Sequence, residues 1–381
     1  MPEPVEERST RRKKDRMNNK KKAQKPDDKK GGSKVAIKVP EKKGVSAEAR
    51  PKPKQKSIEG SVPKVPVSLY MPPGALQSDL PADGPRLTKE QLRPIAMKWV
   101  NRTLEKGVEG LRMEFAAQKK QVDPSLMKEF VANWPNGKNR YKDVGCLDET
   151  RVILNPQSAG SDYIHANYVS TPYNAKRFIC TQGPLDPTIP DFWRMVVQER
   201  SSIILMLCNI IEKGMKKCSE YWPQKQGEKI NFDNMSVVNV ITKMFDLQMD
   251  TASKVQIRIS GICILVDGQV VHSVDHMQVR LLRNCMVPII VHCSAGIGRT
   301  GSIVMLEYML ERLMVGEEIE NMDVLLTRLR QQRAYSIQTD HQYLYIHRVM
   351  LDYFGKKGLI ASDYNTKVAK FIGDYDKYCE C

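Results

Sequence analysis

Two stretches of the chain carry apolar residues at helical spacing. In the first, apolar side chains recur every three or four residues, at Val100, Leu104, Val108, Leu111 and Phe115. Thr88 and Gln91 form a capping box at its start, whereas Gly107 and Gly110 weaken the helix interior. The second stretch, residues 302–314 (SIVMLEYMLERLM), is apolar around most of its circumference. It therefore predicts a largely buried helix.

Strand-like runs lie between these two helices. Residues 257–266 (IRISGICILV) and 287–293 (VPIIVHC) are rich in β-branched side chains, and the second run is uncharged apart from its histidine. A short apolar run of this kind is typical of a strand buried on both faces. The segment 293–301 then joins a strand to a helix, so the sequence predicts a strand–loop–helix junction in an α/β fold.

The first 85 residues have a different composition. Residues 1–60 contain 20 Lys and Arg against 9 Asp and Glu, which supplies +11 of the net charge of +16. No aromatic residue precedes Tyr70, and 12 of the 22 prolines lie at or before residue 85. Such a segment buries too little apolar surface to offset its ordering entropy, so we expect a disordered basic tail. Its runs RRKK (11–14) and KKK (20–22) fit an anionic membrane, an acidic partner or a nuclear address, and a purely solubilising role is equally open.

The cysteines and the hydropathy of the chain indicate the cellular compartment in which we expect the protein. The nine cysteines show no framework spacing, and the chain opens MPEPVEERSTRRKK without an apolar leader. No run approaches the roughly 18 apolar residues that span a bilayer. These features favour a cytoplasmic protein with reduced thiols, with the nucleus as the alternative. A nucleic-acid-binding role rests on the basic tail alone, and we predict no specific nucleic acid partner.

The string VHCSAGIGRTG (291–301) carries the chemistry. Its loop can turn backbone N–H groups toward one anion, at the positive end of the following helix; the loop residues are Ser294, Ala295, Gly296, Ile297 and Gly298. Arg299 offers a planar fork that matches two phosphate oxygens. The same positive field favours the thiolate form of Cys293, with His292 and Thr300 close enough in sequence to adjust it. This pattern predicts phosphoryl transfer through a cysteinyl-phosphate. The alternative is a free cysteine that merely fills a buried strand end.

The string resembles the signature of the classical protein tyrosine phosphatases. Other blocks of that family follow in the expected order: KNRYKDV (138–144), DYIHANYV (162–169), FICTQGPLDPTIPDFWRMV (178–196), EKGMKKCSEYWP (212–223) and RQQRAYSIQTDHQY (330–343). The resemblance implies a twisted mixed β-sheet flanked by helices over residues 86–355, after the tail (1–85) and before an extension (356–381). It also implies hydrolysis of phosphotyrosine in proteins without a metal or an organic cofactor.

Roles for individual residues come with the resemblance. Tyr141 is expected to stack on the substrate ring, and Asp143 to accept hydrogen bonds from the substrate backbone. Glu212 is expected to hold Arg299. Gln338, assisted by Gln342, is expected to position the hydrolytic water. Outside the family context, ordinary core packing for Tyr141 and a weak surface ion pair for Glu212 are the simpler interpretations.

The sequence departs from the family at the general acid. In the family an aspartate on a Trp-Pro-Asp loop protonates the leaving tyrosine, yet no tryptophan lies between Trp222 and Cys293 and no proline between Pro223 and Pro288. VVHSVDHMQ (270–278) resembles the strand that leads into this loop, and only nine residues then precede PIIVHC. Asp275 is the nearest acidic residue and a weak substitute. Lys217, which helps to seat the loop in relatives, is retained.

The missing acid leaves two functional hypotheses. General acid–base catalysis contributes about 10²–10⁴-fold, or about 3–5 kcal/mol of barrier, so we expect a tyrosine phosphatase of reduced activity. The alternative is a catalytically impaired pseudophosphatase, a phosphotyrosine-binding module that holds substrates it cannot release. A shortened isoform or a wrongly joined gene model leaves the same gap in the sequence.

Overall fold

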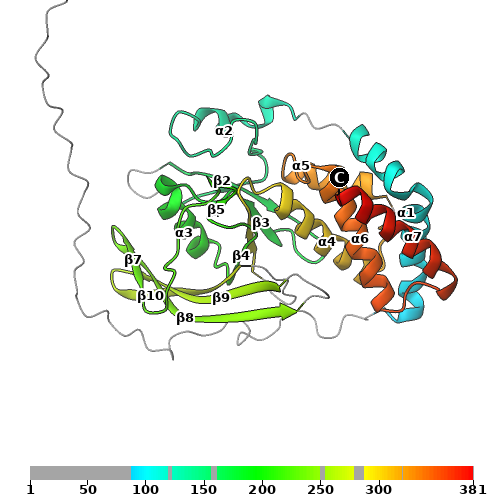
Figure 1. Ribbon diagram of the computed structural model, residues 1–381. Helices are drawn as coiled ribbons and strands as arrows, with labels where there is room; N and C mark the ends of the chain where they lie inside the picture. The colour runs from blue at the N-terminus through cyan, green and yellow to red at the C-terminus, as the bar shows by residue number, and fades with distance from the viewer. Residues whose placement is uncertain are drawn as a thin grey trace, which may run out of the picture. The chain divides into compact units, whose positions relative to one another are not determined.

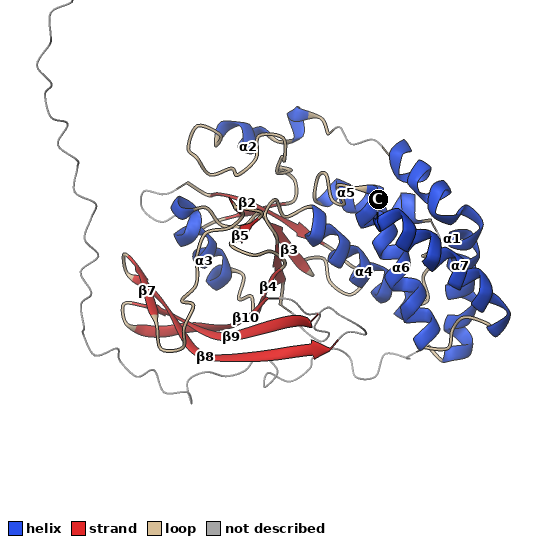
Figure 2. Cartoon of the chain, in the orientation of Figure 1, coloured by secondary structure: helices blue, strands red, loops and turns tan. Residues whose placement is uncertain are grey.

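The computed structural model describes residues 87–118, 122–155, 161–248, 254–278, 287–319 and 321–380. The predicted tail lies outside these residues. A nine-stranded sheet runs through the described part (Figure 2). In spatial order its strands are β1 (Arg151–Ile153), β2 (Tyr163–Val169), β3 (Phe178–Thr181), β11 (Ile289–His292), β4 (Ile203–Met206), β10 (Gln269–Gln278), β9 (Lys254–Val266), β8 (Met235–Gln248) and β7 (Lys229–Phe232).

The sheet is mixed. β11 lies between β3 and β4 and is parallel to both, β10 is parallel to β4, and the outer pairs are antiparallel. All four residues of β11 are buried, as the apolar run 287–293 predicted. A separate hairpin of β5 (Ile211–Glu212) and β6 (Met215–Lys216) follows β4. The predicted mixed sheet with flanking helices is therefore confirmed.

Helices cover the sheet. The longer ones are α1 (Lys89–Ala117), α3 (Ile189–Gln198), α4 (Gly298–Met314), α5 (Met322–Gln332), α6 (Asp340–Lys356) and α7 (Asn365–Glu380). The short ones are α2 (Lys128–Ala132) and the 3₁₀ turns η3 (Pro124–Leu126), η4 (Asp186–Thr188) and η5 (Ser362–Tyr364). Figure 1 shows α1, α4, α5, α6 and α7 gathered together, apart from α3. The capping box at Thr88 is present, and Gly107 breaks the helical backbone of α1 with φ 59° and ψ −173°.

Two apolar cores lie on opposite faces of the central strands. Along β11, Ile289 and Val291 enter the core beneath α1, α4, α5 and α6, whereas Ile290 enters the core beneath α3. This alternation follows from the two-residue period of a strand. It places the end of β11, where Cys293 follows, between two packed layers.

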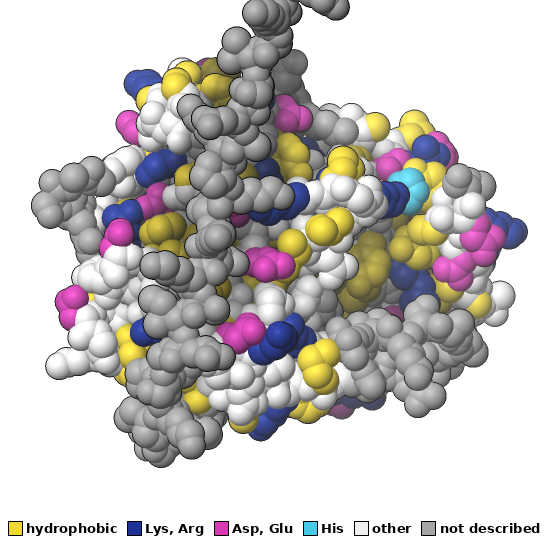
Figure 3. Space-filling model, turned by 60° about the vertical axis from the view of Figure 1, so that its left-hand side comes forward, with side chains coloured by type: hydrophobic (Ala, Val, Ile, Leu, Met, Phe, Trp, Pro, Cys, Tyr) yellow, Lys and Arg dark blue, Asp and Glu magenta, His cyan; other side chains and the backbone are white. Residues whose placement is uncertain are grey.

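The C-terminal residues beyond 356 contribute to the first of these cores. Phe371 of α7 is 3% exposed and belongs to the same apolar cluster as α1 and α6. Tyr378 of α7 donates a hydrogen bond to Asp340 at the start of α6 (2.7 Å). On the face drawn in Figure 3, basic and acidic side chains are interspersed, in keeping with 40 basic and 35 acidic residues over 61–381.

Candidate active site

Cys293 lies at the predicted strand–loop–helix junction. β11 ends at His292, the loop follows, and α4 begins at Gly298. The Cys293 side chain is buried, and the Gly296 N–H points at its sulfur with an N to Sγ distance of 3.3 Å. Gly296 has φ 70°, and a Cβ there would lie 2.0 Å from the Thr181 carbonyl oxygen. Glycine is therefore required for the loop to turn its amide toward the thiol.

Glu212 fixes the guanidinium of Arg299. The two nitrogens Nη1 and Nη2 each lie 2.6 Å from a carboxylate oxygen of Glu212, and Nη1 also donates to the Leu207 carbonyl (2.8 Å). The hydrogen bonds from Arg299 hold the pKa of Glu212 below its ordinary value. The predicted ion pair is thus present and bidentate. It orients the guanidinium at the mouth of the pocket that contains Cys293.

Arg333 supports the loop from behind, a role that the sequence analysis missed. This side chain is fully buried and donates to the carbonyl oxygens of Ala295 and Gly296, at 3.1 Å each. It also donates to Asn167 (2.7 Å) and lies 3.3 Å from His165 Nδ1. Carbonyls held from behind leave the loop amides free to face the pocket. Arg333 lies in the block RQQRAYSIQTDHQY, which could have drawn attention to it. However, the local sequence fits an exposed arginine at this position equally well.

A pocket of about 450 Å³ opens above Cys293. It is lined by Tyr141, Asp143, Val144, Glu212, Lys213, Met215, Lys217, Cys293, Ser294, Ala295, Arg299, Gln338 and Gln342. Tyr141 Oη lies 2.8 Å from Ser294 Oγ, which in turn donates to the Lys217 carbonyl (3.0 Å). One wall is therefore tied to the loop. Lys213 and Met215, on the β5–β6 hairpin, were not singled out from the sequence.

The two glutamines lie against the start of α4. The Gln338 backbone N–H donates to Gln342 Oε1 (2.8 Å), and both side chains line the pocket. A Cβ added at Gly298 would lie 2.7 Å from Gln342 Nε2 and 2.8 Å from Gln338 Oε1. The absence of a side chain at Gly298 thus lets both amides reach the loop that holds Cys293.

His292 and Thr300 were expected to adjust the Cys293 thiolate, and both side chains are fully buried. His292 Nε2 lies 2.7 Å from the hydroxyl of Tyr221, and Nδ1 lies 3.2 Å from the Cys293 carbonyl oxygen. The Thr300 hydroxyl is buried and has no hydrogen-bond partner in the described part of the chain. Neither side chain makes a hydrogen bond to Cys293 Sγ among the described residues, because the strand end turns His292 toward the α3-side core.

Asp275 is in the wrong place for a general acid. It pairs with Ile203 of β4, whereas His292 pairs with Met206. Three residues at about 3.3 Å each put it roughly 10 Å back along the sheet from the end that carries the pocket. Asp275 does not line that pocket, and burial raises its pKa to about 6. The weak substitute considered from the sequence is thus set aside, because a strand residue cannot swing forward.

A second pocket, of about 440 Å³, adjoins the first. It is lined by Leu207, Cys208, Asn209, Glu212, Met244, Arg258, Gln278 and Arg299, so the ion pair of Glu212 and Arg299 separates the two. Gln278 is the last residue of β10 and donates to the Cys208 carbonyl (3.2 Å). The family pattern continues at this strand end into the acid loop.

The family model for protein-tyrosine phosphatase matches residues 135–279 and 263–352. The chain belongs to the protein-tyrosine phosphatase family. The two matched ranges overlap over residues 263–279, which include β10, and no Trp-Pro-Asp sequence follows β10 in this chain. None of the described helices has the length and apolar composition needed to cross a bilayer.

Relatives support the same assignment. The human tyrosine-protein phosphatase non-receptor type 9 is 35% identical over 260 residues, which cover 60% of this chain and 43% of that protein. The receptor-type tyrosine-protein phosphatase F of Danio rerio is 32% identical over 266 residues, covering 63% of this chain and 14% of that protein. The chain thus spans less than half the length of these relatives.

Solved phosphatase structures share the fold. A structure of PTPN18 in complex with HER2-pY1196 phosphopeptides superposes with a TM-score of 0.54 at 26% identity, covering 67% of this chain and 98% of that one. A second PTPN18 structure, on distinct HER2 tyrosine phosphorylation sites, gives a TM-score of 0.56 at 28% identity, covering 69% and 99%.

Proposed function

We propose that this phosphatase-family chain hydrolyses phosphotyrosine in proteins through a cysteinyl-phosphate. The observation that carries the proposal is the buried Cys293 sulfur beneath a pocket whose mouth holds the Arg299–Glu212 pair. The thiolate attacks phosphorus, and the bond to the tyrosine oxygen breaks. A water molecule then attacks the cysteinyl-phosphate, which releases inorganic phosphate and restores the thiolate.

Substrate binding uses groups that line the pocket. Two N–H groups of Arg299 and the loop amides bind the phosphate oxygens, and the ring of Tyr141 packs against the substrate ring. Asp143 accepts hydrogen bonds from the substrate backbone. Gln338 orients the water in the second step, with Gln342 beside it. The depth that Tyr141 gives to the pocket favours phosphotyrosine over the shorter phosphoserine.

We infer that release of tyrosine is slow, because tyrosinate is a poor leaving group without a proton. The supporting observations are the missing Trp-Pro-Asp sequence and the position of Asp275 away from the pocket. A loss of about 10²–10⁴-fold follows for the first step. The same observations favour a second candidate function, a pseudophosphatase that binds phosphotyrosine proteins and rarely cleaves them.

One comparison tests both functions. It measures kcat for p-nitrophenyl phosphate and for a phosphotyrosine peptide, with Cys293→Ser as the blank. Nitrophenolate leaves without a proton, so we expect Cys293-dependent turnover of the ester and turnover of the peptide lower by about 10²-fold or more. Similar kcat values for the ester and the peptide would refute the claim that the chain has no general acid. No Cys293-dependent turnover of either, with peptide bound at micromolar Kd, favours the pseudophosphatase.

The basic tail (1–85) is proposed to bind an anionic membrane or an acidic partner, separately from the phosphatase domain (86–355) and the extension (356–381). Deletion of residues 1–60 removes +11 of charge. We expect it to abolish binding to phosphatidylserine vesicles and to leave nitrophenyl phosphate turnover unchanged. Unchanged vesicle binding would contradict the membrane role.

A further inference from the structure

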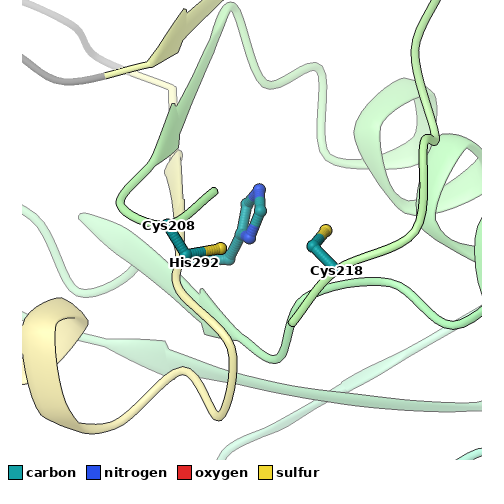
Figure 4. Close-up of side chains that lie close together, drawn as sticks. All are labelled: Cys208, Cys218 and His292. Carbon is teal, nitrogen blue, oxygen red and sulfur yellow. The ribbon is translucent and has the colours of Figure 1, made fainter. Parts of the chain in front are cut away.

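Cys208, Cys218 and His292 form a compact donor cluster beside the active site. One ligand atom from each, two sulfurs and an imidazole nitrogen, lies within 4.8 Å of the others. Figure 4 shows the imidazole of His292 between the two cysteines. Cys208 is 4% exposed and the other two are fully buried. The cluster gathers residues from three segments, the ends of β4, of the β5–β6 hairpin and of β11.

Two thiols and an imidazole suit a soft, tetrahedral divalent ion. Zn²⁺ binds sulfur at about 2.3 Å and nitrogen at about 2.0–2.1 Å, so two cysteine sulfurs on one ion lie roughly 3.8 Å apart. The two sulfurs therefore need to approach each other by about 1 Å at most, and each sulfur needs to approach the imidazole nitrogen by only slightly more. Carboxylate-rich sites select Mg²⁺ or Ca²⁺ instead, and no carboxylate belongs to this cluster. Cys208 also lines the second pocket, which gives an ion an entry path.

We propose that Cys208, Cys218 and His292 bind one Zn²⁺ ion and that the bound ion inhibits the phosphatase. Binding releases the two thiol protons and leaves the fourth position to water from the second pocket. The inhibition rests on the proposed function, whereas the binding does not. His292 and the two cysteines each connect to the active site. Binding of Zn²⁺ to the cluster is therefore expected to change catalysis.

The connection through His292 is direct. Its two nitrogens already contact the Tyr221 hydroxyl and the Cys293 carbonyl oxygen, so a metal ion must replace one of these contacts. Either replacement alters the bonding of the residue that precedes the nucleophile. Cys208 and Cys218 bracket the hairpin that carries Glu212, the partner of Arg299. An ion that joins them pulls on the base of this hairpin.

The binding test uses Co²⁺ as a spectroscopic substitute for Zn²⁺, in the full chain with a non-coordinating reductant. We expect a Co²⁺–thiolate absorption band at one ion per chain that Zn²⁺ abolishes. Cys208→Ala and Cys218→Ala should each remove the band. Each should also weaken the affinity for Zn²⁺ by more than about tenfold, as measured by competition with a chelator. Cys263→Ala is the matched control, because Cys263 is equally buried and lies outside the cluster.

A Cys293→Ala variant separates this site from the catalytic thiol. Retention of the band in Cys293→Ala supports the proposal. Loss of the band there, with retention in Cys208→Ala, overturns it by placing the ion on the nucleophile. Circular dichroism of the metal-free variants checks folding, and Cys208→Val replaces Cys208→Ala if the smaller side chain unfolds the chain.

The inhibition test follows turnover of p-nitrophenyl phosphate with added Zn²⁺. We expect inhibition of the unsubstituted chain and of Cys263→Ala, with at least about tenfold more Zn²⁺ required for Cys208→Ala. Equal inhibition of all three refutes the coupling. A chain without any turnover contradicts the proposed function, but the Co²⁺ band still decides whether the metal site exists.

Discussion

Replacement of Asp275 by asparagine tests the position of this carboxyl in the sheet. Burial raises the pKa of Asp275 to about 6 from an ordinary 3.8, and Oδ1 finds no hydrogen-bond partner in the described residues. The folded state therefore binds the proton more tightly than the unfolded state. Stability from this group is complete below the unfolded pKa and is lost as pH rises through about 6.

The size of the effect follows from the shift. Two pKa units correspond to about 3 kcal/mol at about 1.4 kcal/mol per unit. The side chain keeps partial contact with solvent, so we expect about 1–2 kcal/mol after screening. Asparagine carries no charge at any pH. The change in the free energy of unfolding caused by Asp275→Asn should therefore be more stabilising at pH 7.5 than at pH 4, by this amount.

Urea denaturation followed by tryptophan fluorescence measures the difference at both pH values, with unchanged m as the control for two-state behaviour. An effect of Asp275→Asn that is the same at pH 4 and pH 7.5 would refute the burial argument. Turnover of a phosphotyrosine peptide is the second measurement. We expect it to stay within about twofold, and a fall of about 10²-fold or more would restore Asp275 as the general acid.

Three further substitutions probe the loop, the ion pair and the C-terminal helix. Gly296→Ala should abolish turnover and lower the free energy of unfolding by about 2 kcal/mol or more, because the new Cβ meets the Thr181 carbonyl at φ 70°; near-normal turnover would contradict this. Glu212→Gln should lower kcat/KM by about 10- to 100-fold by freeing Arg299, with a stability change under about 1 kcal/mol in urea because the pair is partly exposed. Phe371→Ala should cost about 3 kcal/mol of stability in the same assay, and a cost below about 1 kcal/mol would show that α7 packs loosely.

Local patterns predicted much of the fold. The capping box at Thr88 and the apolar runs 257–266 and 287–293 appear as a helix start and as strands. Each depends on neighbours a few residues away, which the sequence displays directly. The position of Cys293 between a buried strand and a helix N-terminus followed from the same patterns.

Contacts between distant segments were harder to predict. Arg333 reaches Asn167 across 166 positions of sequence and the loop carbonyls across 37 and 38. Nothing in the local sequence distinguishes a buried arginine from an exposed one. The contacts of His292 were equally hard to predict, because its neighbour Tyr221 lies 71 positions away in the sequence.

The order of the residues alone predicted a cysteine-dependent phosphate-binding loop and displayed the absence of a Trp-Pro-Asp sequence. A thiol, glycines and an arginine at fixed spacing predict a phosphate-binding loop. The absence of Trp-Pro-Asp can be read directly from the order of the residues. Folding brought together the groups that contact one another: Glu212 with Arg299, Arg333 with the loop carbonyls, and two cysteines with His292. Local patterns do not predict these contacts, because packing and long-range hydrogen bonds join residues that lie far apart in the sequence.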